Sequence, residues 1–110
     1  MIKVISSPIS RDELKELAKE IDGYFIKLVV DLDKNIIAAG AKMHFDEEQE
    51  LLRLGSSQQS LWGGGYDLES NTVTYDSIIN NRPGINSGSE IIDVKIRSNV
   101  EKIIRKYLPI

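Results

Sequence analysis

The sequence predicts an α+β fold: a mainly antiparallel sheet of four to five strands packed with three helices, in the order β-α-ββ-α-ββ-α. Short runs of β-branched and aromatic residues occur in pairs separated by turn residues, which is typical of β-hairpins. Apolar residues at helical spacing follow capping residues in other segments. A length of 110 residues suits one hydrophobic core, so we expect a single domain over residues 1–110.

The first half of the chain predicts a strand, a helix and a hairpin. Ser10 stands three residues before Glu13, a capping-box pattern, and apolar residues then repeat at helical spacing as far as Ile21. Turn residues at 33–35 separate two β-rich segments, and the small residues at 38–41 leave room for a packed helix. The expected elements are a strand over residues 2–5, a helix over residues 11–21, and strands over residues 24–32 and 36–43.

The second half predicts a short helix, a second hairpin and a final helix. Asp46 and Asp93 are the expected N-caps, because a short side chain with an acceptor oxygen binds the first free amides of a helix. Three glycines at 63–65 weaken their strand but permit a close backbone approach. Residues 80–89 lack an apolar period and form the expected functional loop. The expected elements are a helix over residues 47–54, strands over residues 61–68 and 72–79, and a helix that follows Asp93 and ends before Pro109.

Composition and charge exclude several classes of protein. The chain has no cysteine, so disulfides and thiolate metal sites are excluded. Its 14 basic and 17 acidic residues give a net charge of -3, so we expect no nucleic-acid binding. No apolar run approaches the roughly 20 residues of a membrane span. Because the first residues lack the pattern of a secretory signal, we expect a cytoplasmic protein that binds no membrane.

Motifs for nucleotide binding and for serine hydrolysis are not matched. The glycines at 63–65 have neither the spacing nor the following helix of a phosphate-binding loop. Ser87 and Ser89 flank Gly88 without the strand-to-helix context of a hydrolase nucleophile. We therefore expect no cofactor of the nucleotide class.

A divalent metal is one of two interpretations of the acidic residues after the only histidine. His44, Asp46 and Glu48 carry imidazole and carboxylate groups that such a metal accepts. The structural interpretation has more support: Asp46 caps the helix, while Glu47 and Glu48 favour the positive end of its dipole.

Four residues around the expected loop are candidates for ligand binding. Arg82 precedes a proline that restricts its backbone, so its guanidinium can present a fork to a carboxylate or phosphate, with amide contacts from Asn81. The structural alternative is that Arg82 binds loop carbonyls or pairs with Asp76. Trp62, with Gln58 shortly before it, can stack on a ligand or anchor a partner, but a single tryptophan is more often part of the core.

Several short segments together resemble a family of short, uncharacterised bacterial and archaeal proteins. The more specific ones are the Leu-Trp-Gly triplet at 61–63 and the Ile-Asn-x-Arg-Pro segment at 79–83. The resemblance implies no established activity. Proteins of that family usually carry a further arginine after the Arg-Pro pair, which residues 84–90 lack, so Arg82 is the only guanidinium of this loop.

Two hypotheses of function follow from these residues. The first is a non-catalytic binding or interaction module that contacts a protein or a small anionic ligand through the loop around Arg82 and Trp62. The second is a metal-assisted hydrolase or nuclease that uses His44 with Asp46 or Glu48, and an arginine to offset negative charge. The sequence leaves open whether the chain is an enzyme and whether it forms a homo-oligomer through a sheet edge.

Overall fold

The computed structural model describes residues 1–110. The chain is built around one antiparallel sheet. The strands lie in the order β1-β3-β2-β4-β5, and every neighbouring pair is antiparallel. The elements are β1 (Lys3–Ile5), α1 (Arg11–Ala18), β2 (Phe25–Asp31), β3 (Ile36–Ala39), α2 (His44–Arg53), β4 (Leu61–Asp67), β5 (Thr72–Thr74) and α3 (Val94–Tyr107), with short 3-10 turns at Gln58–Ser60 and Ile78–Asn80. The predicted α+β class and element order are confirmed.

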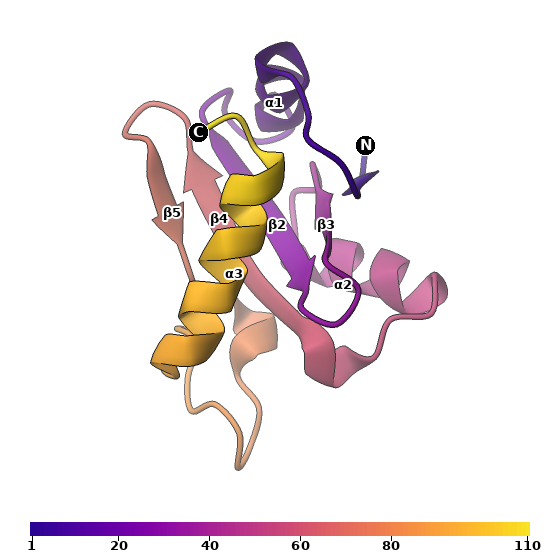
Figure 1. The fold of residues 1–110 in the computed structure, drawn as a ribbon, viewed down its shortest axis with the longest axis vertical. Helices are drawn as coiled ribbons and strands as arrows, with labels where there is room; N and C mark the ends of the chain where they lie inside the picture. Colours follow the sequence, from indigo (N-terminus) through magenta and orange to yellow (C-terminus); the bar gives the residue numbers. More distant parts are fainter.

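The helices cover the two faces of the sheet unequally. Helices α1 and α3 lie on one face, whereas α2 lies behind the sheet at one end (Figure 1). Successive side chains of β2 point to opposite faces of the sheet. Leu28 and Val30 therefore belong to the large cluster with α1 and α3. Val29 packs instead with Leu51 of α2 in a small cluster on the other face. None of the three helices has the length and apolar character that a membrane span requires.

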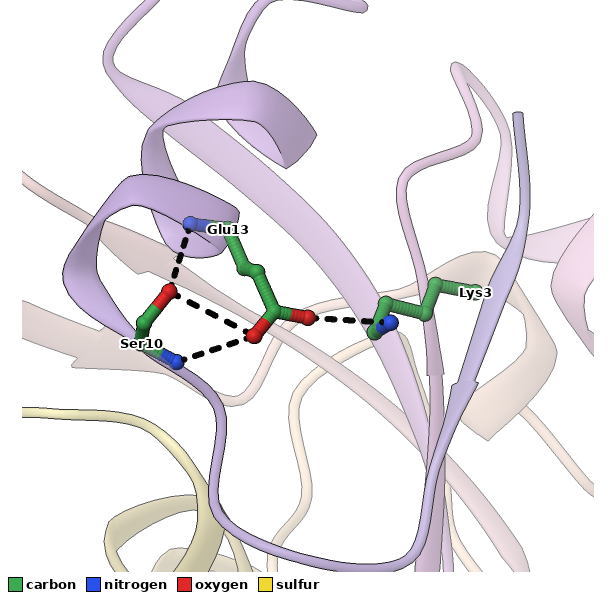
Figure 2. Close-up of polar contacts among 3 residues, drawn as sticks. All are labelled: Lys3, Ser10 and Glu13. Carbon is green, nitrogen blue, oxygen red and sulfur yellow. Dashed lines mark hydrogen bonds and ion pairs between the residues drawn. The ribbon is translucent and has the colours of Figure 1, made fainter.

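The N-terminus of α1 is fixed by the predicted capping box. Ser10 Oγ accepts from the Glu13 amide at 3.1 Å, and the Glu13 carboxylate accepts from the Ser10 amide at 3.3 Å. Figure 2 shows that the same carboxylate also reaches Lys3 of β1, with Nζ 3.0 Å away. The pKa of Glu13 is lowered by the Lys3 contact first and by the Ser10 amide second.

Helix α1 and strand β3 are both shorter than predicted. The helix ends at Ala18 rather than Ile21, because the Ala18 carbonyl accepts from the Gly23 amide at 2.8 Å and turns the chain toward β2. Strand β3 ends at Ala39 rather than residue 43, since Gly40 has a positive φ of 96°.

The predicted N-cap of α2 is wrong. The helix begins at His44, with Met43 in the capping position and no side-chain cap. Asp46 is therefore inside the first turn and exposed, too far along the helix to bind its first amides. By contrast, Asp93 caps α3 as predicted, because its Oδ1 accepts from the Lys95 and Ile96 amides at 2.8 and 3.0 Å.

The glycine-rich strand β4 is central in the sheet, not weak. It pairs with β2 along all seven residues of both strands. Strand β5 is shorter than predicted, however, because its pairing with β4 stops at Thr74. The chain beyond it contacts β4 in another way.

Candidate functional site

The buried side chain of Asn80 takes the place of a strand beside β4. Its Oδ1 accepts from the Gly63 amide at 2.8 Å, and its Nδ2 donates to the Gly63 carbonyl at 2.9 Å. Both main-chain groups of Gly63 are thereby satisfied at the point where β5 no longer runs alongside. The Ile-Asn-x-Arg-Pro and Leu-Trp-Gly segments that the sequence singled out thus bind each other.

A second buried asparagine closes the irregular loop. Asn86 Nδ2 donates to the carbonyls of Asn80, Gly88 and Glu90 at 3.1, 3.2 and 2.8 Å. Its Oδ1 accepts from the Ile92 amide at 3.0 Å. Asn80 adds a bond of 3.0 Å to the Ser89 carbonyl. The two buried amides therefore hold both ends of the loop in one conformation.

The guanidinium of Arg82 binds main-chain carbonyls of the same chain. It donates through Nη2 to Leu61 and through Nη1 to Gln59 at 3.4 Å, and it lies 4.4 Å from the ring centroid of Trp62. Its Nε is buried without a hydrogen-bond partner. Burial lowers the pKa of Arg82, and the nearby Glu48 carboxylate opposes this shift. This is the carbonyl-binding alternative that the sequence left open, without a contact to Asp76.

The other expected ligand-binding residues occupy different environments. Trp62 is only 3% exposed and belongs to the main core. Asn81 is exposed, and its Oδ1 accepts from the Gly88 amide at 3.2 Å. Gln58 is exposed at the start of a 3-10 turn. The structure therefore brings Arg82 and Trp62 together, but with Trp62 turned into the core.

The three expected metal ligands do not form a cluster. His44 Nε2 donates to the Gly64 carbonyl at 2.7 Å, and burial lowers the pKa of this imidazole. Asp46 is exposed and lines a separate depression beside Arg53. Glu48 is buried, with Oε2 lacking a partner. No three histidine, aspartate or glutamate side chains of the chain are arranged to hold a metal ion.

Glu47, which the sequence placed in the first turn of a helix where it favours the dipole, is a fully buried carboxyl. Its Oε2 accepts from the Ala41 amide at 3.0 Å, whereas Oε1 has no partner. Burial raises its pKa to about 9, so the group is protonated at neutral pH. A helix that starts at His44 places residues 44, 47, 48 and 51 on one face, so the helical period contained this signal. The burial of Glu47 was missed because Asp46 was expected to cap the helix, which put Glu47 at its first position.

A cleft of about 700 Å³ opens on the α2 side of the sheet, where the helix does not cover it. Phe25 and Lys27 of β2 line its base. Its walls come from the start of α2, which includes His44, and from the segments around Asp76 and Ser89. Glycines in β4 let these side chains lie directly on the sheet: a Cβ on Gly63 would be 2.6 Å from Ser77 Oγ and 3.2 Å from His44 Cδ2. The predicted close approach at the glycines is thus made by side chains of the cleft.

Comparison with known proteins shows the family of the chain. Searches of the curated proteins and of the solved structures gave no match. A family model described as a protein of unknown function (DUF5674) matches residues 3–107, which is almost the whole chain. The chain therefore belongs to the DUF5674 family of proteins of unknown function.

Proposed function

We propose that this protein is a non-catalytic interaction module of the cytoplasm that binds a partner protein through the outer side of residues 76–94. The proposal keeps the loop that the sequence favoured but changes its contact residues. Because Trp62 is in the core and Arg82 binds carbonyls of its own chain, the contact is assigned to exposed apolar side chains of the segment. The lack of cysteine fits a reducing compartment.

One observation carries the proposal: large aliphatic side chains project into solvent from a segment with a fixed backbone. The exposed fractions are 80% for Ile78, 67% for Ile85, 60% for Ile92 and 79% for Val94. The segment forms the end of the molecule farthest from α1 (Figure 1). All four belong to one stretch of the chain, residues 76–94, and exposed apolar side chains that gather on a surface are typical of protein–protein contact sites. A loop that is already ordered loses little conformational entropy when it binds, so anchoring by Asn80 and Asn86 favours association.

A protein partner is better supported than a small anionic ligand. An anion would need the guanidinium of Arg82, but two of its nitrogens already donate to the carbonyls of Leu61 and Gln59. No basic cluster replaces it in the loop, since residues 83–94 contain neither lysine nor arginine. The exposed side chains of Ile78, Ile85, Ile92 and Val94 offer an apolar contact instead.

The hydrolase or nuclease alternative has no comparable observation in its favour. It needs His44 to share a metal ion with Asp46 or Glu48. The imidazole Nε2 is instead bonded to a carbonyl, Asp46 lines another depression, and Glu48 is buried near Arg82.

The test compares two surface variants as bait. Ile85→Ser with Ile92→Ser removes apolar area from the proposed surface, and Leu54→Ser removes an exposed leucine from the end of α2. Extract of the source organism is passed over each immobilised protein, and captured proteins are quantified by mass spectrometry. We expect the wild type and Leu54→Ser to retain a common partner that the double variant loses at least tenfold. Capture of the same proteins in equal amounts by all three baits would contradict the proposal.

A further inference from the structure

Two carboxylates of the cleft stand directly opposite each other, and neither has an ion-pair partner. Asp76 and Glu90 are partners across an isolated antiparallel bridge, so their side chains share one face. Both residues are exposed, and both line the cleft. No lysine or arginine nitrogen lies within 4.0 Å of either carboxylate. Like charges directly opposite on paired strands destabilise the pair, and a cation between them would remove this repulsion.

The same cleft has an apolar rim. Met43 and Phe45 at the start of α2 are each more than half exposed, and Ile78 faces the cleft from the other wall. A volume of about 700 Å³ lies within the range of pockets that accommodate a large side chain with its neighbours. An apolar side chain that entered the cleft would bury these three residues and lie close to both carboxylates.

We infer that the cleft receives an extended segment of the partner protein in which a leucine or phenylalanine stands next to a lysine or arginine. This inference rests on the proposed function, because it names the chemistry that the partner must present. The apolar side chain enters between Phe45 and Ile78, and the neighbouring cation lies between Asp76 and Glu90. Lys27 is the only lysine or arginine of the cleft, so the two carboxylates leave a net negative charge next to the neutral His44.

Because the cleft carries two carboxylates, it should bind a partner segment that contains a lysine or arginine more tightly than a purely apolar segment. An acidic residue in place of the partner's lysine or arginine would meet two carboxylates across a partly desolvated site. Opposite charges in such a site strengthen binding, and like charges weaken it. The cleft is therefore expected to select the sign of the residue next to the apolar side chain.

The experiment uses two fluorescein-labelled peptide pools that differ at one position. Each peptide has a central leucine or phenylalanine among randomised small residues, followed by lysine or arginine in one pool and by glutamate in the other. Fluorescence anisotropy with the full chain should show the basic pool binding at least tenfold more tightly. The variant Asp76→Asn with Glu90→Gln should lose this preference, whereas the exposed Asp33→Asn should keep it. Thermal unfolding monitors that each variant is folded.

Four outcomes would overturn the inference while leaving the proposed function to its own capture experiment. Equal binding of both pools would show that the carboxylates do not select the partner. A basic preference that survives in the Asp76→Asn, Glu90→Gln variant would place the cation elsewhere. Absence of binding by either pool, or sedimentation showing that a second copy of the chain fills the cleft, would show that no such segment is received. Loss of the common partner in the capture experiment concerns the Ile85 and Ile92 surface, so the two failures are separable.

Discussion

The side-chain amide of Asn80 binds both main-chain groups of Gly63, which lies 17 residues earlier in the sequence. A strand normally provides these two bonds, but β5 ends before it reaches this position. The asparagine therefore continues the sheet without continuing the strand, and the chain is free to leave the sheet as a loop. Because the exposed isoleucines lie on residues 76–94 around this loop, the pair of Asn80 and Gly63 links the core to the proposed contact surface.

Replacing Asn80 by alanine should destabilise the fold strongly. The change leaves the amide and carbonyl of Gly63 buried without partners, and each such group is worth about 1 to 3 kcal/mol. We expect the free energy of unfolding to fall by about 3 kcal/mol in urea denaturation. The neighbouring Asn81→Ala removes only a solvent-exposed bond to the Gly88 amide and should lower it by no more than about 1 kcal/mol. Equal effects of both substitutions would contradict the role assigned to the Asn80 amide.

Alanine at Gly63 should clash with the chain above the strand. The added methyl group would lie 2.6 Å from Ser77 Oγ, and such overpacking of a rigid site costs about 1 to 3 kcal/mol. The double variant Gly63→Ala with Ser77→Gly removes the clashing side chain and should recover part of the loss. Thermal unfolding of the two variants measures the difference. If the double variant were no more stable than the single one, the glycine would be needed for another reason.

Substituting Trp62 or Arg82 should lower the stability of the fold, because both side chains bind parts of the chain itself. Trp62→Ala opens a cavity in the core and should cost about 3 to 5 kcal/mol. Arg82→Ala removes the carbonyl contacts and the cation–π contact, for an expected loss of about 1 to 3 kcal/mol. Urea denaturation measures both losses. If both variants kept wild-type stability, Trp62 and Arg82 would not stabilise the fold and would again be candidates for partner contact.

The substitution Glu47→Gln should flatten the dependence of stability on pH. Burial raises the pKa of this carboxyl in the folded protein from 4.5 to about 9. Between these values the folded state keeps the proton and the unfolded chain releases it, so the free energy of unfolding falls as the pH rises. Below pH 4 both states are protonated, and the group has no effect. Glutamine retains the acceptor for the Ala41 amide but cannot ionise.

We expect Glu47→Gln to be about 1 to 3 kcal/mol more stable than the wild type at pH 8 and equally stable at pH 4. Urea denaturation at a series of pH values measures the slope for each protein. The exposed Glu69→Gln is the matched control and should leave the slope unchanged. If the free energy of unfolding of Glu47→Gln fell with pH as steeply as that of the wild type, the Glu47 carboxyl would be ionised in the folded protein.

The sequence predicted the features that depend on a few neighbouring residues. Ser10 with Glu13 fixed the start of α1, Asp93 fixed the start of α3, and turn residues at 33–35 indicated the first hairpin. The periods of apolar residues then predicted the class of fold and the order of its elements. The errors at the ends of α1 and β3 arose from single backbone features, the Gly23 bond to the Ala18 carbonyl and the positive φ of Gly40. At β5 the pairing stops early, and the Asn80 side chain binds Gly63 of β4 instead of a further strand residue.

Only the tertiary structure decided which candidate residues face solvent and which bind the chain itself. The sequence could not show that Trp62 enters the core or that Arg82 binds the carbonyl of Leu61, because these environments form only after β4 and the loop come together. The burial of Glu47 likewise depends on where α2 begins and on the sheet beneath it. Local propensity acts over one or two turns of chain, whereas burial and hydrogen bonding between distant segments require the packed fold. The cleft exists for the same reason, since its walls come from segments that meet only across the sheet.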